Sequence, residues 1–278
     1  MSENGTTTVN AAVQSSAEPL SAAPATSPNG IEHTLANGRV AVHDPAIVEE
    51  NGIYYLFGTH RRCARSTDMV HWERFDNNLS RDPYALLGDI WQAWPKQDSN
   101  PDLLGNTWAP DVIWNETMGK WCMYLSVNGD QFRSVIVLLT ADHVDGDWTY
   151  VGPVVYSGFD ESNLWNTDVP NVLELEPNAE GTTDYDLTRY LSLKDTRINA
   201  IDAAPALCEH GEMWMSFGSW FGGIWMFKLD PETGLRDYSV RYPLVKDSSD
   251  PYYGVKVAGG YWNSGEGSYF IRENGWWY

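Results

Sequence analysis

The sequence is poor in several features that would assign it to a class at once. It has three cysteines among 278 residues, Cys63, Cys122 and Cys208, which cannot all pair within the chain and match no zinc-binding spacing. We expect these cysteines to be buried free thiols. Basic residues are also scarce, with 18 Lys and Arg against 38 Asp and Glu, so the formal net charge is -20. This acidity argues against nucleic acid and anionic membranes as partners.

Long apolar runs are missing too. No run reaches the roughly 20 residues that a membrane-spanning helix needs, so we expect no membrane insertion. The first residues lack the basic start and apolar centre of a signal peptide, and are rich in Ser, Ala, Thr, Pro and Asn. We therefore predict a disordered or linker segment over residues 1–35.

Aromatic residues, in contrast, are abundant, with 14 Trp and 15 Tyr. Most of them are expected to fill the cores of β layers, although aromatic faces also bind sugars. Four segments repeat one pattern of a short apolar strand, a turn with glycine and a second aromatic-rich strand, over residues 43–57, 109–125, 202–217 and 266–278. Such repeats, without sustained helical periodicity, predict an all-β fold of radial or solenoid type.

Two features of the repeats concern the architecture. Asn51-Gly52 and Asn274-Gly275 lie between apolar runs, as tight hairpin turns require. The copies lie farther apart than the roughly 40–50 residues of a propeller blade, which predicts insertions over residues 77–106 and 157–197 that shape a cleft. The sequence ends at Tyr278, within the fourth copy, so we expect a fragment of a longer protein.

Each copy carries an acidic residue near its start, and four motifs containing these acids occur in a fixed order. They are Val42-His43-Asp44-Pro45, Trp108-Ala109-Pro110-Asp111-Val112, Asn199-Ala200-Ile201-Asp202 and Gly265-Glu266-Gly267-Ser268-Tyr269. In this order they resemble glycoside hydrolase family 43, the five-bladed β-propeller arabinanases and xylosidases. The resemblance covers about residues 40–278. It implies a partial five-bladed propeller over residues 36–278, with about three and a half blades present.

The resemblance assigns a role to three of the acids. It implies that Asp44 is the general base, Glu266 the general acid, and Asp202 the residue that tunes and orients that acid. Glycoside hydrolysis needs one protonated carboxyl and one carboxylate, roughly 6.5–9.5 Å apart in an inverting enzyme. Burial beside the charge of Asp202 would help Glu266 to hold its proton. Asp111 follows its proline instead of preceding it, and a structural role is expected for it.

The motif Asn199-Ala200-Ile201-Asp202 and the stretch from Phe217 to Ile224 resemble the endo-α-1,5-arabinanase branch of the family. The resemblance implies a substrate-binding set of His43, Trp108, Asn199, Ser219, Trp220, Phe221 and Gly222. Packing remains an alternative for Trp108, and a plain glycine-rich turn for the stretch after Phe217. This sequence has Ala203 where the branch usually has proline, and its two insertions could wall off one end of the cleft, which would favour exo action.

No cofactor is required by this chemistry and no metal ligand is assigned. The family often holds a calcium or other ion near the propeller axis, with ligands in a part of the fold that this sequence lacks. The alternatives are an exo-acting α-L-arabinofuranosidase, a β-xylosidase, a non-catalytic carbohydrate-binding propeller and a protein scaffold. The presence of all three acids favours the enzyme. A polysaccharide or oligosaccharide substrate implies an extracellular or cell-surface location, and the sequence does not indicate the oligomeric state.

Overall fold

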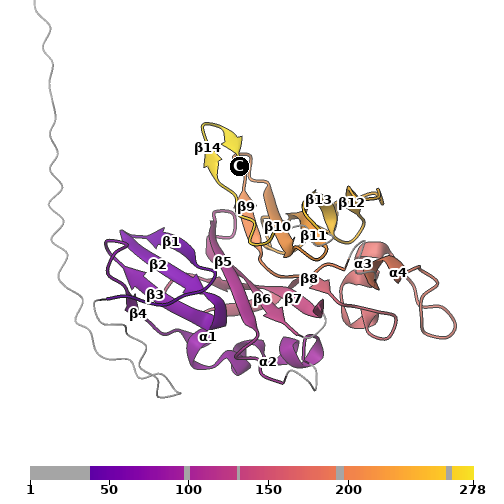
Figure 1. The fold of residues 1–278 in the computed structure, drawn as a ribbon, viewed down its shortest axis with the longest axis horizontal. Helices are drawn as coiled ribbons and strands as arrows, with labels where there is room; N and C mark the ends of the chain where they lie inside the picture. The colour runs from indigo at the N-terminus through magenta and orange to yellow at the C-terminus, as the bar shows by residue number, and fades with distance from the viewer. Residues whose placement is uncertain (1–37, 97–100, 130–131, 192–196, 261–264) are drawn as a thin grey trace, which may run out of the picture.

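The computed structural model describes residues 38–96, 101–129, 132–191, 197–260 and 265–278. The predicted linker over residues 1–35 lies outside these ranges. The described residues form three antiparallel sheets that follow one another along the chain, and then a short hairpin (Figure 1). The predicted all-β fold is confirmed, because antiparallel sheets form the framework; in the first two sheets the strands follow one another in chain order.

The first sheet shows how the repeat pattern folds. Its strands, hydrogen-bonded in chain order, are β1 (Ala46–Glu50), β2 (Ile53–Gly58), β3 (Arg62–Ser66) and β4 (Glu73–Arg74). Glu50 pairs with Ile53 across the predicted two-residue turn, where Asn51 and Gly52 have φ of 55° and 80°. Both residues tolerate this left-handed backbone, so the turn sets the register of the two strands.

The second sheet contains the most deeply buried strands. It is formed by β5 (Thr107–Asn115), β6 (Lys120–Asn128), β7 (Ser134–Ala141) and β8 (Thr149–Ser157). Every residue of β7 is buried, which agrees with its continuous apolar run. β7 pairs with β6 on one side and with β8 on the other, and both of its faces are buried in the core. Cys122 on β6 is a buried free thiol, as is Cys63, whereas Cys208 is partly exposed.

The third sheet repeats the meander with one extra strand. Its members are β9 (Ala204–Leu207), β10 (Met213–Ser219), β11 (Gly223–Leu229), β12 (Ser249–Asp250) and β13 (Gly254–Ala258). The spatial order is β9-β10-β11-β13-β12, so β13 takes the fourth position and β12 lies at the edge. The first strands of the second and third sheets, β5 and β9, contact each other.

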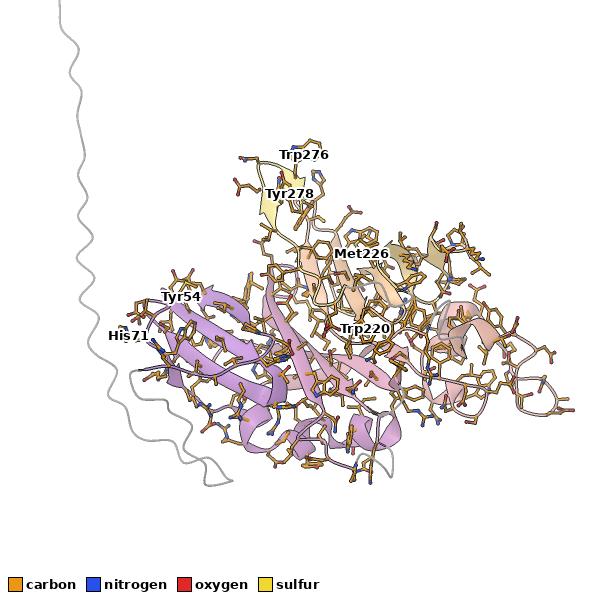
Figure 2. The ribbon with its side chains drawn as sticks, viewed as in Figure 1. Tyr54, His71, Trp220, Met226, Trp276 and Tyr278 are labelled. Atoms are coloured by element: carbon orange, nitrogen blue, oxygen red, sulfur yellow. The ribbon has the colours of Figure 1, made fainter. Side chains whose placement is uncertain are left out.

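The fourth copy differs from its expected form. The strand predicted at its start, residues 266–271, is not formed, and the copy is reduced to the hairpin of β14 (Arg272–Glu273) and β15 (Trp276–Trp277). Trp276 and Tyr278 are 71% and 72% exposed, and Figure 2 shows them on the hairpin that stands away from the three sheets. A two-stranded hairpin with exposed aromatic side chains gains little from burial, and additional strands are needed to stabilise such a unit.

The two insertions contain helices that the sequence analysis did not predict. These are α1 (Asn78–Arg81), α2 (Pro83–Ala93), α3 (Val169–Leu173) and α4 (Thr188–Leu191). The first insertion, predicted without helices, contains α2, in which Asp82 caps the N-terminus and Pro83 is the first helical residue. Leu87 and Trp91, one turn apart, are fully buried, so packing of one face stabilises a helix with a polar outer side.

A buried ionic network attaches the second insertion to the third sheet. Asp168, just before α3, accepts hydrogen bonds from the hydroxyls of Tyr252 (2.5 Å) and Tyr238 (3.0 Å). The guanidinium of Arg236, whose side chain is 3% exposed, lies 3.4 Å from the same carboxylate through Nε. An ionic group buried this deeply depends on its partner, because unpaired burial of charge is unfavourable.

Asp168→Asn should therefore lower the free energy of unfolding by about 1–2 kcal/mol, since the amide keeps an acceptor oxygen but leaves Arg236 without a counter-charge. Urea unfolding followed by tryptophan fluorescence measures this change. Glu161→Gln, an acid-to-amide change at an exposed position of the same insertion, is the matched control and should leave the midpoint unchanged. Equal midpoints for Asp168→Asn and the wild type would show that the network is not stabilising.

Candidate active site

The site begins with a backbone feature that recurs in the three sheets. A residue at the start of each repeat copy has a left-handed backbone, with φ of 51° at Asp44, 38° at Ala109 and 56° at Asp202. We call it the leading residue of its sheet; Asp44 and Asp202 precede their first strands, whereas Ala109 is the third residue of β5. Aspartate adopts this conformation more readily than most residues. Because the strands are antiparallel, the end of each second strand returns to the same edge as the start of the first. The N–H of Thr59 thus donates to the carbonyl of His43 (3.0 Å).

The same return occurs in the third sheet, where the N–H of Gly218 donates to the carbonyl of Ile201 (2.9 Å). In the first sheet the approach is close enough to require glycine, because a Cβ on Gly58 would lie 2.8 Å from the carbonyl oxygen of His43. The carboxylates of Asp44 and Asp202 are therefore carried by equivalent, tightly held backbone positions at the same end of the strands in their sheets.

Asp44 has two hydrogen-bonding neighbours, and both contact the same oxygen. The hydroxyl of Thr59 donates to Oδ2 at 2.6 Å, and Nδ1 of His43 lies 2.6 Å from Oδ2. His43 itself is 83% exposed at its side chain, whereas that of Asp44 is 38% exposed. The predicted base is thus held from one side while its carboxylate remains accessible to water.

The pKa of Asp202 is raised by its surroundings. Burial raises its pKa to about 6, and the negative charges of Asp44 and Glu266 add to this effect. The N–H of Gly267 donates to Oδ2 of Asp202 at 3.1 Å and partly offsets the shift. These influences show that the structure brings all three predicted acids into one electrostatic environment.

Glu266 reaches this environment through its two following residues. Gly267 makes the hydrogen bond to Asp202, and the hydroxyl of Ser268 lies 2.7 Å from that of Ser216 on β10. The side chain of Glu266 is exposed, so the burial expected of the general acid is not seen. The physical reason is that this segment forms no strand and is held beside the third sheet by these point contacts.

The predicted substrate-binding residues fall into two groups. Trp108 is partly buried and its indole N–H donates to the carbonyl of Gly105 (2.8 Å). Asn199 is 8% exposed and its side-chain oxygen accepts from the hydroxyl of Ser134 (2.7 Å), so it also joins the third sheet to the second. His43 contacts Asp44 directly. Contact between sugar and any of these three residues stays a prediction.

The second group occupies the turn between β10 and β11. Ser219 is 1% exposed, and the rings of Trp220 and Phe221 stack with centroids 4.0 Å apart. Gly222 packs so closely that a Cβ would lie 2.6 Å from Ile198, which explains the glycine by packing. Trp220 is labelled in Figure 2 where the third sheet meets the second.

The sequence analysis missed one aromatic residue in this region. Phe132, from the turn between β6 and β7, contacts the ring of Phe221 with centroids 4.5 Å apart. The guanidinium of Arg197 lies over the ring of Phe132, 5.0 Å from its centre. The turns of two sheets thus build one aromatic cluster, which only the three-dimensional register of the sheets could reveal.

Asp111 lies outside this environment, at a cavity of about 180 Å³ between β5, β9 and the terminal hairpin. The other residues that line it are Val112, Ile113, Pro205, Ala206, Leu207, Tyr269, Phe270 and Trp277. Burial raises the pKa of Asp111 to about 7, although the N–H of Val112 donates to its Oδ1 at 2.8 Å. Asp111 is not among the charges that shift the pKa of Asp202.

Within the residues that the structure describes, no group of three or more His, Cys, Asp and Glu side chains is arranged to hold a metal ion. None of the described helices is long and apolar enough to cross a membrane. The calcium ion suggested by the resemblance stays an untested expectation.

Neighbouring carboxylates, one of them with a pKa of about 6, are compatible with the acid–base chemistry of glycoside hydrolases. Residues 38–171 match Glycosyl hydrolases family 43. The chain belongs to this family, and its similarity to relatives extends well beyond the matched residues. It is 32% identical to an extracellular endo-α-(1→5)-L-arabinanase of Thermotoga petrophila over 232 residues, which are 83% of this chain and 42% of the relative.

Two further comparisons agree. The chain is 28% identical to the extracellular endo-α-(1→5)-L-arabinanase 2 of Bacillus subtilis, over 84% of this chain and 42% of that protein. The crystal structure of a family 43 glycoside hydrolase from Bacillus licheniformis superimposes with a TM-score of 0.61 at 28% identity, covering 84% of this chain and 45% of the other. The chain thus spans less than half the length of these relatives.

Proposed function

We propose that the protein is an inverting glycoside hydrolase that cleaves α-1,5-linked L-arabinofuranosyl bonds within arabinan. The observation that carries this proposal is the convergence of Asp44 and Glu266 on Asp202, whose pKa is raised to about 6 by burial and by those two charges. Such a set of interacting carboxyls supplies the protonated and ionised groups that glycoside hydrolysis needs at one site. The similarity to arabinanases supports the choice of substrate.

The mechanism assigns one task to each acid. Asp44, ionised and accessible, removes a proton from a water molecule that attacks the anomeric carbon from the side opposite the leaving group. Glu266 donates its proton to the glycosidic oxygen as the bond breaks. Asp202 supports the proton on Glu266 through its charge and holds the segment in place through the N–H of Gly267. In an inverting enzyme this leaves the base and acid roughly 6.5–9.5 Å apart, with water between them.

The architecture proposed for the whole protein is a five-bladed propeller. Its first blades are the three meanders described above, and the terminal hairpin begins the next. Successive meanders around one axis would direct the edges that carry Asp44, Ala109 and Asp202 towards a common centre. The stacked rings of Trp220 and Phe221 are then suited to face a furanose ring of the polymer. An extracellular location follows from a polymeric substrate, and the arabinanase relatives are described as extracellular.

The experiment that tests the proposed function is product analysis with the full-length protein. Linear arabinan, arabinoxylan and an aryl arabinofuranoside are incubated separately, and the products are separated by chromatography. We expect arabino-oligosaccharides from linear arabinan. Free arabinose as the first product would show exo action and not endo action. Release of xylose, or no release from any substrate, would refute the arabinanase assignment.

The tuning role of Asp202 gives a separate prediction. Asp202→Asn should reduce kcat/KM by about 10–100-fold and move the basic limb of the pH–rate profile to lower pH. Above about pH 6 the ionised Asp202 favours the protonated form of its neighbouring acid, so removal of this charge lets that acid lose its proton earlier. Asp89→Asn, at an exposed position on α2, is the control. An unmoved basic limb in Asp202→Asn would disprove the tuning role.

A further inference from the structure

The hydroxyl of Thr59 connects the first two sheets at the edge that carries the site. Thr59 follows the end of β2 and is 8% exposed. Its Oγ1 lies 2.6 Å from Oδ2 of Asp44 and accepts the N–H of Ala109, the leading residue of the second sheet, at 2.9 Å. One side chain therefore touches the proposed base on its own sheet and the backbone of the neighbouring sheet.

These two contacts fix the direction of the hydrogen bond. A threonine hydroxyl has a single proton and two lone pairs. The N–H of Ala109 can only donate, so it occupies a lone pair of Oγ1 and leaves the hydroxyl proton for the carboxylate. The bond to Asp44 is consequently a donation to Oδ2.

A serine makes the same kind of contact between the second and third sheets, but it does not also donate to an acid of the site. Ser126 lies as many residues after the first residue of β6 as Thr59 lies after the first residue of β2. The Oγ of Ser126 accepts a hydrogen bond from the N–H of Asp202 at 3.1 Å. Thr59 and Ser126 each tie the end of a second strand to the leading residue of the following sheet. Thr59 differs because its proton is directed at an acid of the site.

We propose that Thr59 is a positioning residue for the general base, which holds Asp44 by Oδ2 so that Oδ1 faces the attacking water. This inference rests on the proposed function. The charged or titratable groups around the base are His43, which contacts Oδ2, and the acids Asp202 and Glu266. Asp202 and Glu266 cannot donate to Asp44 when ionised, and the side chain of His43 is 83% exposed, whereas Thr59 is a buried donor fixed by its second contact to the adjoining sheet.

The test compares variants of the full-length protein on linear arabinan. Thr59→Val keeps the shape and removes the donor. We expect kcat/KM to fall about tenfold, through kcat with KM unchanged, and the acidic limb of the pH–rate profile to move up by about one pH unit, because the ionised base loses a hydrogen bond. Thr59→Ser keeps the hydroxyl and should restore both the rate and the limb.

Thr140→Val is the matched control, since Thr140 is 9% exposed and lies on β7, outside the site. It should leave the acidic limb unchanged. If Thr59→Val does not fold, Thr59→Cys carries a weaker donor and should give a smaller shift in the same direction. An acidic limb that stays in place in the folded Thr59 variants, or one that Thr59→Ser moves as far as Thr59→Val, would overturn the inference.

The wild-type reaction separates this inference from the proposed function. A wild type that does not hydrolyse arabinan refutes the proposed function before any Thr59 variant is compared. A wild type that is active, with Thr59→Val showing the same profile, refutes the positioning role alone.

Discussion

Replacing Asp44 with alanine in the full-length protein should reduce the release of reducing ends from linear arabinan by about 10³-fold. The attacking water then has no base in contact with it, and proton removal by a positioned carboxylate contributes about 10²–10⁴ to the rate. Glu266→Ala should cause a loss of similar size, because the leaving oxygen departs without its proton. The two losses should combine less than additively, since both acids act in one step.

The two variants should respond differently to the leaving group. An aryl arabinofuranoside with an acidic phenol needs little protonation as it leaves, so Glu266→Ala should regain much of its rate on this substrate while Asp44→Ala should not. Asp89→Ala on the exposed face of α2 controls for the substitution itself. Near-normal activity of either active-site variant on arabinan would remove its assigned role, provided that its unfolding midpoint equals that of the wild type.

The strands and turns of this fold could be predicted because their signals are local. Asn51 and Gly52 have the positive φ angles that a two-residue hairpin requires, and the apolar runs around them became β1 and β2. The buried run at Ser134–Ala141 became β7. The positions of the predicted acids also follow the repeat, because Asp44 and Asp202 occupy the same left-handed position before the first strands of the first and third sheets. A repeat in sequence therefore became a repeat in backbone geometry.

The remaining features depend on contacts between distant segments. The helix α2 had recognisable signals in Asp82 and Pro83, but its stability comes from burying Leu87 and Trp91 against the core. The role of Thr59 depends on a neighbour fifty residues away, the N–H of Ala109. The contact of Thr59 leaves no periodic pattern in the sequence, and the helical spacing of Leu87 and Trp91 does not indicate which surface the helix packs against.

Asp111 shows how the second copy diverged from the others. Ala109 occupies the leading position where the first and third sheets carry an acid, and the acid of the second copy is displaced into β5. There it lines a cavity, most of whose other residues are hydrophobic, instead of the site, and its charge also contributes to a raised pKa of Tyr269, after the larger effect of burial. An ionised carboxylate in such surroundings opposes folding unless it serves a purpose or takes up a proton.

Asp111→Asn should therefore stabilise the protein above neutral pH. The pKa of Asp111 is about 7 in the folded state and near 3.8 when unfolded, so between these values the folded state binds a proton that the unfolded state has lost. The wild type consequently loses stability through this group as the pH rises from about 4 to 7, and the loss is complete above about pH 7. The amide carries no charge and keeps an oxygen for the N–H of Val112.

The gain should thus be absent near pH 4 and reach roughly 2–3 kcal/mol at pH 8, as measured by urea unfolding across this range. Asp89→Asn should show no such pH-dependent gain, because Asp89 is exposed on α2. A gain of equal size at pH 4 and pH 8 would indicate better packing and not the removal of a buried charge. A loss at pH 8 would show that the ionised Asp111 has a favourable partner in the folded protein.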